Sequence, residues 1–271
     1  MVLPDKQITT KNDLKELFYK LGLSSGADIM VHSSLSSLGY VVNGALDVID
    51  ALVEVVGKSG TILMPAHTGQ LTDPTEWNSP QVSEKFIEII KKNMNTFNAA
   101  LTQVRSRGII SSTFLSYPEV MRSDHPLNSV SALGERSEYY TNEHYFDEPE
   151  GINSPIGKLY KSNGKVLLLG VGLKRCTAIH LAEYIADVEY LYINNPVVLK
   201  ENIGGNNKFV PIKKYPGTSE YFDKYIPELN DKGYLVKENF RSGDVILFEM
   251  KHVVDFIVSR LHLDPQCLIK P

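Results

Sequence analysis

The stretch DIMVHSSLSSLGYVVNGALDVIDALVEVVGKSGTILMPA, residues 28–66, contains three structural elements in a row. A short apolar strand comes first, an amphipathic helix from Gly44 to Gly57 follows a polar turn, and a second apolar strand runs from Gly60 to Ala66. Apolar runs bounded by glycine are typical of buried strands, and the order strand, helix, strand is the signature of a βαβ unit with a parallel pair. The stretch therefore predicts an α/β fold.

Segments on both sides of this unit extend the pattern. KVLLLGVG (Lys165 to Gly172) predicts a further central strand. In the carboxyl third, YINNPVVLK and NKFVPIKKY predict a hairpin around ENIGGNN, and DVILFEM predicts one more strand. The spacing of apolar residues predicts helices over residues 10–21, 83–92, 108–116, 177–187, 218–229 and 251–261, and a short helix after Ser154. We expect a three-layer sandwich with a mainly parallel central sheet and an antiparallel C-terminal extension, forming a single domain over residues 1–271 with 190–271 as a smaller lobe.

Composition excludes several classes of protein. The chain has 28 Lys and Arg against 32 Asp and Glu, a net charge of −4, so nothing indicates a nucleic-acid or anionic membrane partner. Two cysteines provide no disulfide framework, and the histidines show no zinc-binding spacing, so we expect no metal. The amino terminus lacks an apolar signal core, and no stretch approaches the roughly 20 apolar residues of a membrane span. We therefore expect a cytoplasmic protein.

The segment TAIHLAEYIAD directly after the KVLLLGVG strand carries the strongest chemical pattern. Thr177, His180 and Glu183 are three residues apart and therefore share one face of a helix. The carboxyl end of a strand is where open α/β sheets place their ligands, and an imidazole beside a carboxylate is a general base with an orienting partner. The alternative is a polar helix face that simply contacts water.

Three further segments are rich in polar side chains. VHSSLSSLG (Val31 to Gly39) offers hydroxyls and backbone N–H groups to a ligand, although such loops are often plain turns. RSDHPLNSVSALG places Arg122 and His125 on a turn, where they bind a ligand or merely stabilise the loop. Acidic residues that could attract a cationic acceptor, or belong to solvated loops, are Asp73, Glu76, Glu143, Asp147, Glu148 and Glu150.

Taken in order, six segments resemble the aminoglycoside N3-acetyltransferase family. They are VHSSLSSLG, GTILMPA, RSDHPLNSVSALG, SPIGKLY, VLLLGVG and TAIHLAE. The resemblance runs from about Leu14 to Asp187 and continues more weakly through the carboxyl third. It implies an α/β fold distinct from the small N-acetyltransferase fold, and transfer of an acetyl group from acetyl-CoA to an amine.

Carried onto this chain, the resemblance implies a role for each motif. His180 becomes the catalytic base, Glu183 its partner and Thr177 a hydroxyl at the reacting centre. The residues it implies for acetyl-CoA are His32, Ser33, Ser34, Ser36, Ser37, Leu38, Gly39, Arg122, Ser123 and His125, and those for the acceptor are Asp73, Glu76, Asp147 and Glu148. An imidazole with a pKa near 6.5 can take the proton that an ammonium acceptor must lose. A hydroxyl or N–H then stabilises the oxyanion, and no acyl-enzyme is needed.

The expected acceptor is the 3-amino group of a 2-deoxystreptamine aminoglycoside, but one segment departs from the family. The family has a Thr-Pro pair, then a Met-Gly pair that opens a helix with Glu-x-Phe-Arg. Here Thr102-Gln103 replaces Thr-Pro, and the Met-Gly pair and the Glu-x-Phe-Arg element are missing. The alternatives are the same CoA chemistry on a metabolite or natural-product amine, a serine hydrolase using the Ser-rich loop, or a non-catalytic CoA-binding module. A homodimer is possible, and the sequence does not decide whether His67 or His125 assists His180.

Overall fold

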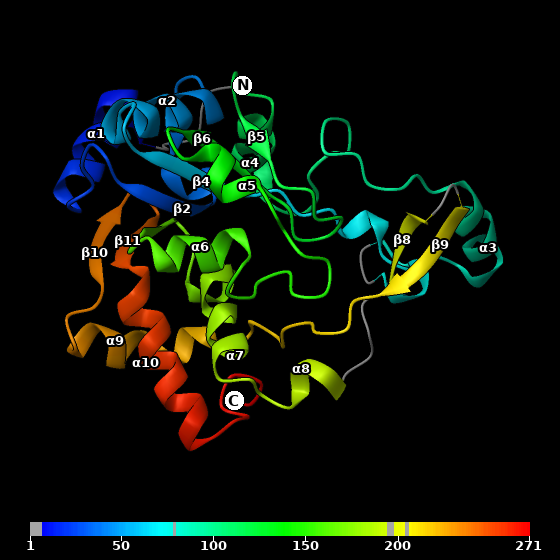
Figure 1. Ribbon diagram of the computed structural model, residues 1–271. Helices are drawn as coiled ribbons and strands as arrows, with labels where there is room; N and C mark the ends of the chain where they lie inside the picture. Colours follow the sequence, from blue (N-terminus) through cyan, green and yellow to red (C-terminus); the bar gives the residue numbers. More distant parts are fainter. Residues whose placement is uncertain (1–6, 78–79, 194–197, 204–205) are drawn as a thin grey trace.

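A seven-stranded sheet forms the centre of the molecule in the computed structural model, which describes residues 7–77, 80–193, 198–203 and 206–271 (Figure 1). Its strands, in spatial order, are β10 (Val236–Phe240), β11 (Gly243–Glu249), β7 (Lys165–Leu169), β2 (Asp28–Ser33), β4 (Thr61–Pro65), β6 (Val130–Gly134) and β5 (Met121–Arg122). The α/β class is thereby confirmed.

The sheet is mixed. Strands β7, β2 and β4 are parallel, and β11 and β6 add to the two edges in antiparallel register. The expected antiparallel extension near the C-terminus is the β10–β11 hairpin. A second antiparallel pair, β5–β6, lies at the other edge and includes both ends of RSDHPLNSVSALG, which we expected to form a turn. The parallel part is limited to three strands because both ends of the sheet are built from hairpins, which need no helical crossover.

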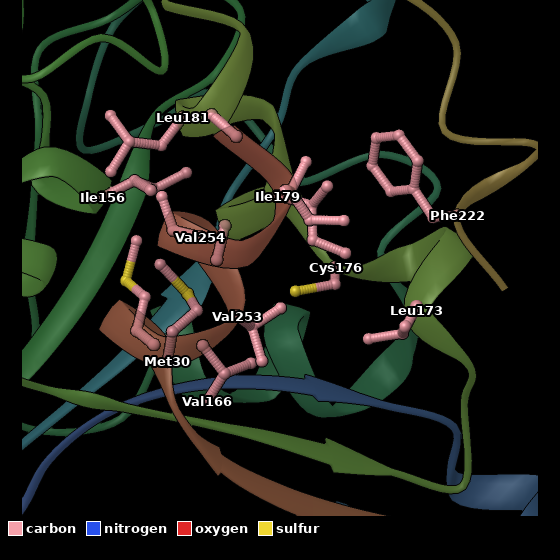
Figure 2. Close-up of a cluster of buried hydrophobic side chains, with 14 of the residues drawn as sticks. Met30, Ile156, Val166, Leu173, Cys176, Ile179, Leu181, Phe222, Val253 and Val254 are labelled. Atoms are coloured by element: carbon pink, nitrogen blue, oxygen red, sulfur yellow. The ribbon is translucent and has the colours of Figure 1, made fainter. Parts of the chain in front are cut away.

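Helices cover both faces of the sheet. On one face α1 (Lys11–Lys20), α2 (Ala45–Val56) and α4 (Gly108–Leu115) pack on alternate strand residues such as Ile29 and Val31. On the other face α5 (Ser137–Thr141), α6 (Pro155–Lys161), α7 (His180–Ile185) and α10 (Met250–Leu263) pack on the intervening residues such as Met30. Figure 2 shows part of this second cluster, including Ile179 and Leu181 beside Val254 of α10. Because Ile179 and Leu181 flank His180, their burial fixes where His180 lies.

Most predicted helices are confirmed, with one clear shift. Thr10 caps α1 in a reciprocal hydrogen-bonded box with Asp13, as the polar residues before that helix indicated. The helix expected over residues 218–229 instead begins with a 3₁₀ turn, Phe222–Tyr225, that leads into α9 (Ile226–Asp231). Pro227 explains the shift, because proline has no N–H and is tolerated only in the first turn of a helix.

A small unit stands apart from the central sheet (Figure 1). The predicted hairpin forms β8 (Val198–Ile203) and β9 (Asn206–Pro211), while the start of YINNPVVLK belongs to α8 (Tyr190–Ile193), and residues 194–197 and 204–205 lie outside the described residues. The hairpin packs on α3 (Glu84–Asn93), where the Lys200 ammonium donates to the carbonyls of Lys91 and Met94, each at 2.6 Å. A short parallel pair, β1 (Ile8–Thr9) and β3 (Tyr40–Val41), completes the described strands. Within the described residues, no helix is long and apolar enough to cross a membrane.

Replacing Leu168 by Ala tests the central position of β7. Leu168 is fully buried between His32 of β2 and Ile246 of β11. The lost burial and the remaining cavity should lower the free energy of unfolding by about 2–5 kcal/mol, measured by urea denaturation. Leu263→Ala, at a side chain that is 78% exposed, is the matched control and should change it by less than about 0.5 kcal/mol. Equal effects in both variants would contradict the assigned core.

Candidate active site

The carboxyl ends of the three parallel strands, β7, β2 and β4, lie side by side at the same end of the sheet. His32 and Ser33 end β2, His67 follows β4, and Gly170 follows β7. Parallel strands bring such residues together, and ligand sites of α/β sheets form outside these ends. Three adjoining cavities lie here.

The inner cavity, of about 100 Å³, contains the segment with the strongest chemical pattern. It is lined by His67, Arg107, Asn128, Glu150, Lys174, Arg175, Cys176, Thr177, His180, Tyr215, Pro216, Gly217 and Ser219. Arg107, Lys174 and Arg175 also line the middle cavity, of about 440 Å³. The middle cavity in turn shares Ser33, Ser34 and Gly108 with the outer cavity, of about 730 Å³. A long ligand can therefore reach the inner cavity from the Ser-rich loop.

His180 and Glu183 form a buried pair at the wall of the inner cavity. Their side chains meet through Nδ1 of His180 and Oε2 of Glu183, 2.7 Å apart. The other carboxylate oxygen of Glu183 accepts from the hydroxyl of Tyr190 at 2.7 Å and from the backbone N–H of Gly217 at 3.2 Å. Phe222 packs its ring against the imidazole edge to face, with the two ring centres 4.9 Å apart. These contacts hold the imidazole in one orientation.

The surrounding charges make His180 more basic than an ordinary histidine. Burial alone lowers its pKa, but the negative charges of Glu183 and Glu150 and the hydrogen bond to Glu183 outweigh burial, so that the net pKa is raised above 6.5. A protonated imidazole is thereby stabilised next to the cavity.

Thr177 lies just before α7 rather than within it. The helix begins at His180, and Thr177 opens the preceding 3₁₀ turn, Thr177–Ile179. Its hydroxyl contacts Nε2 of His32 at 3.4 Å. Burial and the charge of Arg107 lower the pKa of His32 to about 3, so this imidazole is neutral at physiological pH. The structure thus brings Thr177, His180 and Glu183 to one site, with His32 added from β2.

Two residues of the inner cavity, Arg107 and Tyr215, were not predicted from the sequence. Arg107, at the start of α4, contacts Nδ1 of His67 through its guanidinium, and Tyr215 closes the cavity from the segment after β9. Glu150 is fully buried, and its Oε1 accepts from the side-chain amide of Asn128 at 2.9 Å. The sequence did point to two other lining residues. His67 follows a buried strand as His32 does, and Glu150 belongs to the acidic loop.

The Ser-rich loop lines the middle and outer cavities with part of its residues. Ser33 and Ser34 face both cavities, His32 the middle one, and Ser36 and Gly39 the outer one. The Ser33 hydroxyl is buried without a hydrogen-bond partner. Ser37 instead donates to the carbonyl of Gly170 at 3.0 Å, which is allowed because Gly170 has a positive φ of 72° and a Cβ there would lie 2.5 Å from Ser37. The side chain of Leu38 belongs to the core and not to a ligand surface.

The residues of RSDHPLNSVSALG expected to contact a ligand are bonded to other parts of the protein. Arg122 donates to the carbonyls of Ala66 and Ala99 at 2.7 and 3.2 Å and packs over the ring of Phe97. Ser123 bonds to His144 at 2.9 Å. His125 accepts two backbone N–H groups at Nδ1, and burial lowers its pKa to about 4. Arg122 therefore joins its loop to more distant segments, Ser123 and His125 bond to nearby residues, and none of the three lines the three cavities.

The acidic residues expected at an acceptor site are mostly ion-paired. Asp73 pairs with Lys91, Asp147 with Lys213 and Glu148 with Lys214, at 2.8, 2.9 and 2.8 Å. Glu76 is exposed on the 3₁₀ turn Pro74–Glu76. None of the four lines the inner cavity. Among the described residues, no group of three His, Cys, Asp or Glu side chains is placed to hold a metal ion.

Comparison with known proteins places the chain in a family. The family model "Aminoglycoside 3-N-acetyltransferase" matches residues 30–262. The SPbeta prophage-derived aminoglycoside N(3')-acetyltransferase-like protein YokD of Bacillus subtilis is 36% identical over 248 residues, which cover 91% of this chain and 90% of YokD. The crystal structure of YokD superposes with a TM-score of 0.88 and 34% identity, covering 96% of each chain.

Two solved aminoglycoside acetyltransferases are also similar. The apoenzyme of AAC(3)-IVa has a TM-score of 0.84 at 26% identity, covering 98% of this chain and 93% of that one. AAC-IIIb, solved as a binary complex with CoASH, has a TM-score of 0.78 at 25% identity, covering 95% of this chain and 97% of that one. The fold and the site together define an α/β enzyme with adjoining cavities, the innermost of which is lined by the histidine of a buried His–Glu pair. The chain belongs to the aminoglycoside 3-N-acetyltransferase family, which uses acetyl-CoA as acetyl donor, and it is an acetyltransferase.

Replacing Glu183 by Gln tests the electrostatics of the pair. The variant removes a negative charge that raises the pKa of His180, so that the pKa should fall, as measured by NMR titration of the His180 ring protons. Because the native pKa is raised on folding, this pair stabilises the protein below about pH 6.5 and the stabilisation is lost as pH rises through the native pKa. In Glu189→Gln, at an exposed position, the His180 titration should be unchanged. An unchanged pKa in Glu183→Gln would refute the electrostatic account.

Proposed function

We propose that this enzyme transfers an acetyl group directly from acetyl-CoA to a primary amine in the inner cavity, with His180 as general base. The observation that carries the proposal is the buried His180–Glu183 pair at the end of a series of cavities that reaches the Ser-rich loop. The CoASH complex of AAC-IIIb supports the donor.

The proton transfer follows from the hydrogen bond of Nδ1. Because Nδ1 faces the Glu183 carboxylate, it carries the ring proton, and Nε2 is left to accept a proton from the amine. The amine nitrogen then attacks the thioester carbon, the carbon–sulfur bond breaks, and the proton passes to the leaving sulfur, giving an amide and a free thiol. In this proposal the hydroxyl of Thr177, which lines the same cavity, donates to the developing oxyanion. Cys176 does not act as a nucleophile, because burial raises its pKa to about 12.

The middle and outer cavities fit the elongated donor. Ser33 offers a buried hydroxyl without a partner, and Ser34, Ser36 and Gly39 continue the wall outward. The exposed side chains of Lys174 and Arg175 at the junction of the cavities add positive charge suited to phosphates. When bound, acetyl-CoA supplies the activated acetyl group.

A 2-deoxystreptamine aminoglycoside stays the predicted acceptor by resemblance, but one observation favours a different amine. Aminoglycosides are polycations, whereas the inner cavity is lined by Arg107, Lys174 and Arg175. The acidic residues expected to receive a polycation are mostly paired with lysines of the same chain. The same CoA chemistry on a non-aminoglycoside amine is therefore the second candidate.

The serine hydrolase alternative has little support. In the Ser-rich loop, as the structure describes it, the Ser34 hydroxyl contacts the Ser36 hydroxyl and the Ser37 hydroxyl donates to a carbonyl. His32 contacts Thr177 and no serine. A nucleophile hydrogen-bonded to a base, which a hydrolase needs, is not formed by these side chains.

We also propose a single domain in three layers. Strand β11 and helix α10 share the sheet and one core with the amino-terminal strands, and the part of residues 190–271 that stands apart is the hairpin β8–β9. The homodimer and the cytoplasmic location stay predictions.

Replacing His180 by Ala tests the general base. With acetyl-CoA and a panel of aminoglycosides and simple amines, free-thiol release should fall by about 10²- to 10⁴-fold, because the proton acceptor is lost. The Kd for acetyl-CoA, measured by calorimetry, should stay unchanged. His262→Ala, at an exposed position on α10, is the matched control and should keep the native rate. Near-native turnover in His180→Ala would exclude His180 as the base.

Replacing Ser33 by Ala tests the donor channel. If the buried hydroxyl binds the donor, its loss removes one hydrogen bond and should raise the KM for acetyl-CoA by roughly 2- to 12-fold with kcat little changed. Ser24→Ala, at an exposed position before β2, should leave both constants as they are. An unaltered KM in Ser33→Ala would move the donor to another surface.

A further inference from the structure

The guanidinium of Arg107 lies in the inner cavity without a carboxylate partner. One terminal nitrogen contacts His67, the Nε atom is buried with no hydrogen-bond partner, and among the described residues no carboxylate oxygen forms an ion pair with it. Burial is the main influence on its pKa and lowers it from the usual value. A buried cation of this kind is unfavourable unless an anion or acceptor faces it.

Glu150 presents the opposite charge in the same cavity. Its Oε1 is bonded to Asn128, while its Oε2 is buried with no hydrogen-bond partner. Burial raises the pKa of this fully buried carboxyl. His180, backed by Glu183, lines the same cavity. The cavity therefore holds an acidic group and a cationic group, each with an unsatisfied atom, that do not form an ion pair with each other.

The cation at this position belongs to the segment in which the chain departs from its family. The resemblance expects a Met-Gly pair opening a helix, and here α4 opens at Gly108 directly after Arg107. The methionine of that pair is absent, and the residue before Gly108 is the charged Arg107. Among the described residues this cation forms no ion pair with an acidic side chain.

We propose that the acceptor is a small primary amine that also carries an anionic group, which Arg107 binds. The proposal rests on the acetyl transfer proposed above and names its substrate class. The anionic group would form charge-assisted hydrogen bonds with the Arg107 guanidinium that lines the cavity, while the amine faces Glu150 and His180. A cavity of about 100 Å³ also suits a small acceptor, since drug-sized ligands occupy roughly 300–1,000 Å³.

Matched pairs of acceptors test the proposal. We would compare 3-aminopropanoate with its methyl ester, and phosphoethanolamine with ethanolamine, alongside a 2-deoxystreptamine aminoglycoside. Thiol release gives kcat/KM, and calorimetry on the CoA complex gives acceptor binding without turnover. For the native enzyme, kcat/KM for the acidic acceptor of at least one pair should exceed that for its uncharged partner by about tenfold or more. This is the difference expected of one charge-assisted hydrogen-bonded contact. Which pair shows the preference distinguishes a carboxylate from a phosphate.

Arg107→Met, which keeps an unbranched side chain and removes its charge, is the decisive variant. It should lower the preference for the acidic acceptor by about tenfold and leave the KM for acetyl-CoA unchanged, whereas Arg107→Lys should retain part of the preference. Arg105→Met is the matched control, because the Arg105 guanidinium packs over Trp77. Thermal melts of each variant verify folding.

Three results would overturn the proposal. The first is a native preference for the uncharged acceptor or the aminoglycoside. The second is an Arg107→Met enzyme with a raised KM for acetyl-CoA and an unchanged acceptor preference, which would assign Arg107 to the donor. The third is the absence of calorimetric binding of every acidic amine. If no acceptor releases thiol but acidic amines still bind in an Arg107-dependent way, the proposed acetyl transfer fails while the acceptor class is supported.

Discussion

The fully buried carboxylate of Glu183 joins three parts of the chain that the fold brings together. It receives the imidazole of His180 from its own helix, the hydroxyl of Tyr190 from α8 and the N–H of Gly217 from the segment after β9. A carboxylate buried at this depth without partners would be strongly unfavourable, so these three contacts together stabilise it. The carboxylate that orients the imidazole also binds Gly217, which lines the inner cavity.

From the segment after β9, the inner cavity is lined by Tyr215, Pro216, Gly217 and Ser219, and ion pairs hold the residues just before them in place. Asp147 pairs with Lys213, and Glu148 with Lys214, whose carbonyl accepts from the hydroxyl of Tyr184 at 3.0 Å. The acidic loop therefore stabilises the structure of the cavity, and only Glu150, three residues beyond Asp147, lines it. Charge that looked available for a cationic ligand is largely neutralised within the protein.

How much the sequence could predict depends on the range of the interactions involved. The period of apolar residues predicted β2, β4 and β7, and the three-residue spacing predicted that His180 and Glu183 would meet, because both signals are local. The role of Arg122 depends on the carbonyl of Ala66, 56 residues away, which no local pattern reveals. Arg107 and Tyr215 were missed for the same reason, since irregular segments carry them to the cavity.

Electrostatic surroundings, and not residue type, separate the histidines of this site. His32 and His67 are buried near Arg107, and both influences lower their pKa, so they are neutral and serve as walls. His125 uses Nδ1 to accept two backbone N–H groups and its Nε2 faces the carbonyl of Phe146, which leaves no free nitrogen for proton transfer. Of these histidines only His180 has carboxylates close enough to raise its pKa, together with an Nε2 that forms no hydrogen bond within the described residues. The site thus keeps one histidine basic, while burial, assisted by the charge of Arg107, keeps two others neutral, and the same cation is available to an anionic substrate group.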